Sequence, residues 1–195
     1  MAADRARPRV DAPAAHCGQA RALRPLTEHL NVARVRAHAA ERGTGIEPQR
    51  FAQTTRTAGD AAREIGCTVA EIVKSLVFIA DDRPVVVLCS GEDRVDEQRL
   101  RVALGASVAR RATADEAKAA TGFPIGGVAP FAHARPCRVI ADGRLLRHAR
   151  VWAAAGLPDA VFPIAPEQLV EIAGAEVAAV AADQSSVSSS SDSNS

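Results

Sequence analysis

Two strong strand signals lie next to each other in residues 72–89, IVKSLVFIADDRPVVVLC. Ser75–Ala80 and Val85–Cys89 are rich in β-branched and other apolar side chains, and each has the length of a strand. Asp81-Asp82-Arg83-Pro84, which lies between them, has the residue types of a tight turn. We therefore predict two strands joined by a hairpin-like turn.

Helix and strand signals alternate through the rest of the folded part. Thr57 precedes a short periodic segment that Gly66 ends, and Thr113 with Glu116 has the spacing of a capping box. Together the signals predict helices from Asn31 as cap to Gly43 and over 58–65, 96–104, 113–120 and 166–173, a helical turn at 69–73, a short helix or turn at 151–155, a hairpin turn at Asp142-Gly143, and short strands at 46–53, 107–109, 137–141, 160–164 and 176–180. Strands joined by tight turns and mixed with helices favour an α+β fold with a mixed sheet.

The length of 195 residues allows one domain of ordinary size with a tail at each end. Residues 1–25 mix Arg, Ala and Pro without helical periodicity, and residues 183–195 are mostly Ser. Such segments have little to bury, so we expect both to be disordered. An Arg-rich organelle-targeting leader is the alternative for the first segment, although such leaders also favour Ser. The folded domain is expected to span residues 26–182.

Composition argues against several classes of protein. With five Phe, one Trp and no Tyr, the chain has little material for a sheet that stacks RNA bases on aromatic rings. No apolar run reaches the roughly 18 residues of a membrane span, and none near the N-terminus resembles a signal peptide, so we expect a cytoplasmic protein without membrane contact. The four cysteines, at positions 17, 67, 89 and 137, lack the two-residue spacing of zinc or redox motifs, so we expect reduced thiols and no metal.

Charge is unevenly distributed in this chain of net charge +1. Residues 94–150 hold 11 basic and 5 acidic side chains, a net charge of +6. Binding of a polyanion by one face of the protein would fit this distribution. Solvated helix faces rich in Arg are the alternative explanation.

Lys74 lies inside an apolar run of a chain that has 22 Arg and only two Lys. Strand alternation puts its side chain on the same face as Leu76 and Phe78. A lysine is a compact point charge that suits one oxygen in a narrow pocket, and a buried amine without a partner is costly. A ligand-binding ammonium is therefore one interpretation, and a snorkelling lysine or an ion pair with Glu71 is the other.

Residues 122–130, GFPIGGVAP, cannot form regular structure, and we call this segment the Gly loop. Gly126-Gly127 lies between two prolines, so the bend is rigid and exposes backbone N–H groups with no side chain in the way. A substrate can approach such a bend closely and be held by its N–H donors. An ordinary turn is the alternative. His133 is the histidine nearest to the loop, and no nucleophile motif accompanies it.

Val73–Phe78, in which Lys precedes Ser, and Thr121–Phe131, with its Gly-Gly-x-x-Pro pattern, follow each other in a specific order and spacing. Together they resemble the YbaK/ProX family of freestanding aminoacyl-tRNA deacylases, which is similar to the editing domain inserted in bacterial prolyl-tRNA synthetases. The resemblance covers residues 30–182 and includes the stretches 57–62 and 151–156.

This resemblance implies an α+β fold with a mixed, partly barrel-like β-sheet flanked by helices. It implies hydrolysis of the ester between a wrong amino acid and the terminal adenosine of a tRNA, commonly proline tRNA, without a cofactor. Lys74 would contact the phosphate or the amino-acid end of the substrate, Gly126 would hold the acyl carbonyl and orient the water, and Pro130 would fix the loop. The substrate-binding residues expected beside them are Ser75, Gly127, Val128, Pro130, His133 and Ala154. The implied partners are the acceptor end of an aminoacyl-tRNA and, as a further candidate, prolyl-tRNA synthetase.

An activated ester needs little more than a positioned water and an oxyanion partner, with the adenosine's own 2′-hydroxyl as a proton relay. The expected target is a small acyl group such as alanine, because a synthetase pocket distinguishes one methylene by only about 1–3 kcal/mol. The branch of the family that acts on cysteine carries Ser-Gly-Gly near Ala154-Ala155-Gly156, which argues against cysteine specificity. A non-catalytic binder of a tRNA end or nucleotide, and a small-molecule hydrolase unrelated to tRNA, are the alternatives.

Overall fold

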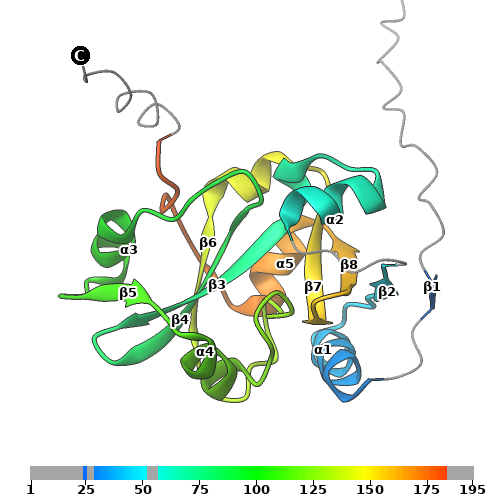
Figure 1. Ribbon diagram of the computed structural model, residues 1–195, viewed down its shortest axis with the longest axis horizontal. Helices are drawn as coiled ribbons and strands as arrows, with labels where there is room; N and C mark the ends of the chain where they lie inside the picture. The colour runs from blue at the N-terminus through cyan, green and yellow to red at the C-terminus, as the bar shows by residue number, and fades with distance from the viewer. Residues whose placement is uncertain (1–23, 26–28, 52–56, 184–195) are drawn as a thin grey trace, which may run out of the picture.

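The computed structural model describes residues 24–25, 29–51 and 57–183 (Figure 1). Its longest strands are β3 (Val73–Ala80) and β4 (Arg83–Ser90), which pair antiparallel along their full length. The predicted hairpin is confirmed, and each strand is longer than predicted. Asp81 and Asp82 form the turn with positive φ angles of 44° and 64°, a region of backbone space that Asp tolerates better than most residues.

β3 and β4 lie in a five-stranded mixed sheet with the order β5-β3-β4-β6-β9. β5 (Ala109–Arg111) pairs antiparallel with only the last three residues of β3, Phe78–Ala80. β6 (Arg138–Asp142) and β9 (Glu176–Ala178) follow in parallel on the other side of β4. Because β5 is short, it leaves the first half of β3 without a neighbouring strand of this sheet on that side.

The second sheet has four antiparallel strands in the order β1-β2-β8-β7. They are β1 (Arg24–Pro25), β2 (Gln49–Arg50), β8 (Ala160–Ile164) and β7 (Val151–Leu157). An isolated parallel bridge between Ile72 and Trp152 connects the two sheets. The predicted α+β fold with a mixed sheet is confirmed, but the described strands do not close into a barrel.

Five α-helices and two 3-10 helices are present among the described residues. They are α1 (Leu30–Glu41), α2 (Ala58–Ile65), α3 (Glu97–Leu104), α4 (Ala114–Thr121), α5 (Pro166–Ala173), η1 (Val69–Glu71) and η2 (Gly143–Arg147). The local signals predict α2 and α5 with their observed bounds. Thr57 forms a capping box with Asp60, and Gly66 ends α2 with a left-handed φ of 79°.

Three local predictions are wrong. The cap of α1 is His29, whose side chain accepts from the N–H of Asn31, while the Asn31 amide donates instead to the carbonyl of Gly156 at 3.0 Å. Residues 151–155 belong to strand β7, because pairing with β8 and burial outweigh the helix propensity of three alanines. Asp142 does not form a hairpin turn: it caps η2, and its buried carboxylate accepts from the N–H groups of Val180 and Ala181.

Four short strands also differ from their predicted bounds. The strand predicted at 137–141 is β6, which begins and ends one residue later, and the strand predicted at 176–180 is β9, which ends at Ala178. The strand predicted at 107–109 is β5, displaced by two residues, and that predicted at 46–53 is confined to Gln49–Arg50. Residues 52 and 53 lie outside the described residues, as do 1–23 and 184–195, so the predicted disorder of these tails stays a prediction. Arg24–Pro25 of the predicted N-terminal tail pairs with β2 as β1.

Apolar side chains pack on both faces of the central hairpin. On one face, Val77 and Val86 join the main core, which includes Ala153 and Phe162 of the second sheet. On the other face, Phe78 packs in a smaller cluster that contains Leu100 of α3. No helix among the described residues has both the length and the apolar character needed to cross a membrane.

Candidate active site

A cavity of about 380 Å³ lies along the half of β3 that β5 leaves uncovered. Its lining comes from β3, from α2, from the Gly loop and from β7 and β8 of the second sheet. The described residues that line it are Phe51, Thr57, Ala58, Ala61, residues 72–77, Arg111, Ala112, Ala117, Ile125, Gly126, Val128, Trp152, Ala154, Pro158, Ala160 and Val161. The cavity is therefore a junction of both sheets, mostly apolar, with few polar groups to orient a ligand.

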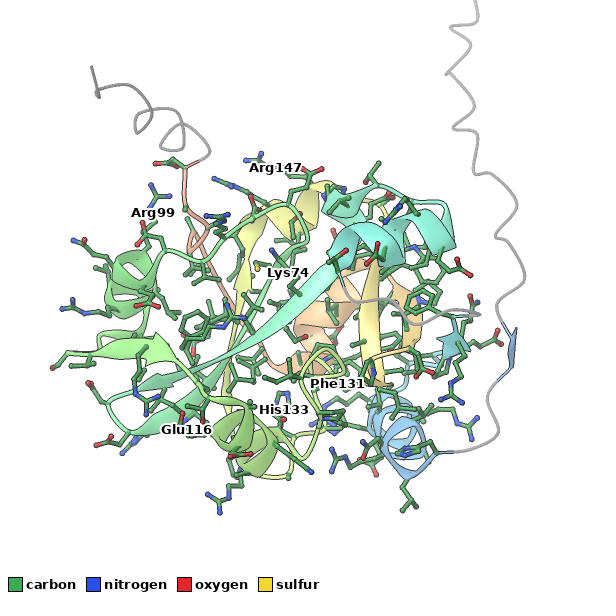
Figure 2. All side chains as sticks on the ribbon, in the orientation of Figure 1. Lys74, Arg99, Glu116, Phe131, His133 and Arg147 are labelled. Atoms are coloured by element: carbon green, nitrogen blue, oxygen red, sulfur yellow. The ribbon has the colours of Figure 1, made fainter. Side chains whose placement is uncertain are left out.

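Lys74 is half-buried in the wall of this cavity, and its ammonium donates a hydrogen bond to the backbone carbonyl of Asp93 (Figure 2). Glu71, the alternative ion-pair partner, instead accepts from the N–H and hydroxyl of Thr68. An ammonium has three N–H donors, so the bond to Asp93 leaves two for a ligand.

Cys89 is the residue opposite Lys74 on β4. Burial raises the pKa of the Cys89 thiol to about 11, in spite of the nearby ammonium, so the thiol is neutral at physiological pH. The lysine therefore does not face a thiolate. Cys67 and Cys137 are also free thiols, and Cys17 lies outside the described residues.

Ser75 lies in the same wall, and its hydroxyl is buried without a hydrogen-bond partner. A buried polar atom of this kind costs free energy unless something satisfies it. The hydroxyl can donate one hydrogen bond and accept two, but it lies under the cavity surface on the face of β3 opposite the Lys74 side chain. Contact with a substrate would satisfy this hydroxyl after a local shift of the wall, and the role of Ser75 as a substrate contact stays a prediction.

The two glycines of the Gly loop have different surroundings. Gly126 is exposed, lines the cavity and has a φ of +81°, which favours glycine. Gly127 is buried, donates to the carbonyl of Pro124 at 3.0 Å, and packs so closely on the β7–β8 turn that a Cβ would lie 2.6 Å from the carbonyl carbon of Leu157. Gly126 thus faces the ligand space, and Gly127 holds the loop against the second sheet.

His133 and Pro130 lie outside the described lining of the cavity. A ring nitrogen of His133 is hydrogen-bonded to the carbonyl of Ala129 at 2.9 Å, and the ring meets Phe123 edge-on. Burial lowers the pKa of His133, which keeps the imidazole neutral. Figure 2 shows His133 away from Lys74, and its hydrogen bond to Ala129 ties it to the end of the Gly loop.

The structure therefore brings Lys74, Ser75, Gly126, Val128 and Ala154 of the predicted site together around one cavity. Sequence reasoning missed Arg111 and Trp152, which line it as well. Both positions depend on pairing between distant segments: Arg111 pairs with Phe78 of β3, and Trp152 bridges to Ile72.

The charges of the cavity wall restrict its chemistry. Lys74 and Arg111 are the charged residues among those described in the lining, which include no Asp, Glu, His or Cys. The described part of the chain also has no group of three or more such side chains placed to hold a metal ion. The described wall offers two cations to anionic oxygens of a ligand, but it provides no carboxylate or imidazole base.

The comparisons with known proteins agree with this geometry. Residues 52–172 match the aminoacyl-tRNA editing domain family. The uncharacterised protein YwhH of Bacillus subtilis strain 168 is 28% identical over 149 residues, which are 76% of this chain and 94% of YwhH. The proline-tRNA ligase of a Streptococcus thermophilus strain is 35% identical over 86 residues, 44% of this chain but 14% of the ligase.

A solved structure has the same fold. The crystal structure of a candidate trans-editing enzyme for prolyl tRNA synthetase has a TM-score of 0.76 and 36% identity, and the match covers 80% of this chain and 100% of the other. The family match spans both Lys74 and Gly126 as well as strands β3 to β8. The chain belongs to the aminoacyl-tRNA editing domain family.

Proposed function

We propose that this protein is a cytoplasmic trans-editing hydrolase that cleaves the ester of a mischarged aminoacyl-tRNA. Its substrate in this proposal is proline tRNA carrying a small wrong amino acid such as alanine. The observation that carries the proposal is that Lys74 and Gly126, from two distant segments, line one cavity. The editing-domain family and the similarity to a candidate trans-editing enzyme for prolyl tRNA synthetase support it.

In the proposed hydrolysis, a water oxygen replaces the ribose oxygen on the acyl carbon. A water oxygen attacks the ester carbonyl, and negative charge develops on the carbonyl oxygen. In this proposal the Lys74 ammonium and the backbone N–H groups around Gly126, which line the cavity, stabilise that charge. Electrostatic stabilisation of this kind is usually the largest single contribution to catalysis of acyl transfer. The bond between the carbonyl carbon and the ribose oxygen then breaks, and a proton from the water goes to the ribose oxygen. The products are the free amino acid and the uncharged tRNA.

The proton transfer is assigned to the substrate. The described lining contains no carboxylate or imidazole, and its hydroxyl groups belong to Thr57 and Ser75. The neighbouring ribose hydroxyl of the terminal adenosine lies next to the scissile ester and can relay the proton. The protein's contribution is then orientation and electrostatic stabilisation.

In this proposal the side chains that the second sheet contributes to the cavity lining limit the size of the acyl group. Ala154, Ala160 and Val161 of the second sheet line the cavity, and Trp152 and Ile72 lie where the two sheets meet. Small side chains leave room for a small acyl group. One extra methylene in such a pocket changes the binding free energy by about 1–3 kcal/mol, so a second pocket is needed to remove errors that a synthetase accepts.

Proline tRNA charged separately with alanine, serine, cysteine and proline tests the proposal. We expect release of alanine at a rate well above spontaneous hydrolysis, with proline retained. Binding of the tRNA without release of any amino acid would instead identify a non-catalytic binder of the tRNA end. If the tRNA is not bound and no amino acid is released, the result would favour a small-molecule hydrolase. Co-purification with prolyl-tRNA synthetase tests the further expectation that the synthetase is a partner.

A further inference from the structure

Arg111 is the second cation of the cavity wall, and it lies at a defined position relative to Lys74. It stands opposite Phe78 in the β5–β3 pairing, and its guanidinium carbon is 5.7 Å from the centre of the Phe78 ring. Side chains at positions 74 and 78 share one face of β3, since residues of a strand alternate. Four residues of strand separate these positions by about 13 Å. The Arg111 side chain covers part of that distance, since its charge acts on the Cys89 thiol that lies opposite Lys74. The two cations therefore reach one wall from two different strands.

The surroundings of Arg111 differ from those of its neighbour on β5. Arg110 makes two hydrogen bonds to the Glu116 carboxylate, at 2.9 and 2.7 Å, and Arg138 pairs in the same way with Glu176. Among the described residues no carboxylate pairs with Arg111, and no acidic residue lines the cavity. An exposed guanidinium at the side of an acid-free cavity has its donors available for an anion.

We propose that Arg111 binds a phosphate of the tRNA 3′ end, the phosphodiester next to the terminal adenosine. This inference rests on the proposed function and assigns separate tasks to the two cations. The planar guanidinium suits two oxygens of one phosphate, whereas the compact Lys74 ammonium suits the single carbonyl oxygen of the ester. Lys74 then acts on the reacting atoms, and Arg111 sets the register of the tRNA end along β3.

Two substrates that differ in the phosphate test this assignment. One is proline tRNA charged with alanine, and the other is 3′-O-alanyl adenosine, which carries the same ester without a phosphate. Arg111→Gln is expected to lower kcat/KM on the tRNA about tenfold or more, the effect of one lost charge-assisted hydrogen bond, and to leave hydrolysis of the nucleoside ester unchanged. The plot of log kcat/KM on the tRNA against log salt concentration is expected to be less steep for Arg111→Gln than for the wild type, by about 1, the contribution of one phosphate contact.

Arg110→Gln is the matched control, because it removes the same charge from the same strand at a residue outside the cavity lining. Arg110→Gln is expected to have little effect on kcat/KM with either substrate. Equal losses on both substrates with Arg111→Gln, or no loss on either, would overturn the phosphate assignment. Unchanged hydrolysis of the nucleoside ester also shows that the variant is folded.

A binding measurement separates this inference from the proposed function. If the wild-type protein hydrolyses neither ester, the proposed function fails. Binding of the trinucleotide CCA, measured for the wild type and for Arg111→Gln, still decides the phosphate subsite. Weaker binding by the variant supports the subsite, and equal binding, or no binding by the wild type, contradicts it.

Discussion

The ammonium of Lys74 donates to the backbone carbonyl of Asp93, and this contact links the cavity wall to the segment after β4. The Asp93 side chain is buried and pairs with Arg144 at 2.6 Å, while Arg144 also donates to the carbonyl of Ala182. The position of the ammonium therefore depends on an ion pair that lies outside the cavity. Sequence spacing alone does not predict this link, since Asp93 and Arg144 are 51 residues apart.

Replacing Arg144 by Met is expected to destabilise the protein by about 3 kcal/mol, because it leaves the Asp93 carboxylate buried without its partner. Urea unfolding measures the loss. Arg147→Met is the control, since Arg147 is exposed and follows in the same 3-10 helix. Equal stability of the two variants would show that the ion pair does not hold this segment.

Ser75→Ala is expected to weaken the reaction with the substrate without lowering the stability of the protein. The Ser75 hydroxyl is buried without a partner, so its removal should leave stability unchanged or raise it by about 1 kcal/mol. A lost hydrogen bond to the substrate should lower kcat/KM roughly three- to tenfold. Thermal unfolding and deacylation of alanine-charged proline tRNA measure the two effects. An unchanged kcat/KM would remove Ser75 from the substrate contacts.

Gly127→Ala is expected to displace the Gly loop and to destabilise the protein by about 1–3 kcal/mol, because the new methyl group would overlap the backbone of Leu157. The rate of deacylation should also fall, because a displaced Gly loop moves Gly126 away from its position in the cavity lining. Gly45→Ala is the control, because a Cβ there meets no atom within 4 Å. If Gly127→Ala is as stable and active as Gly45→Ala, the close contact does not position the loop.

Stability is expected to fall as the pH drops below about 6.5, the ordinary pKa of histidine. Burial is the main cause that lowers the pKa of both His38 and His133 in the folded protein. Below pH 6.5 the unfolded chain therefore binds more protons than the folded protein at these two residues, which favours unfolding. Urea unfolding at several pH values between 7.5 and 5 measures the slope.

The double variant His38→Gln, His133→Gln should show a smaller slope over the same pH range. His29→Gln is the control, because His29 is an exposed residue at the start of α1. An equal slope in the wild type and the double variant would show that other groups cause the pH dependence.

The elements that could be predicted from the sequence are those with local signals. The capping residue Thr57 and the left-handed Gly66 delimit α2, and Pro166 and Gly174 delimit α5. The β3–β4 hairpin follows from two apolar runs and a short polar turn. Strand β7 could not be predicted in this way, since its alanines favour a helix when they are considered alone and become a strand through pairing with β8.

The candidate site shows the same division. Lys74 is conspicuous because it is a lysine in an apolar run, and Gly126 because it lies in a bend between prolines; the resemblance connects the two. Arg111 and Trp152 enter the cavity through the register of β5 on β3 and through the bridge to Ile72. Register between distant segments has no local signal, so these two residues required the structure.

The rate of deacylation of alanine-charged proline tRNA by Lys74→Ala is the most direct test of the account. The chain offers a matched control in Lys118→Ala, since Lys118, its other lysine, is exposed on α4 and outside the cavity lining. We expect Lys74→Ala to lose at least about 100-fold in kcat, the effect of removing one oxyanion partner, while remaining folded. Lys118→Ala should keep the wild-type rate. A wild-type rate in the Lys74→Ala variant would contradict the central claim that the cavity beside β3 is where the ester is cleaved.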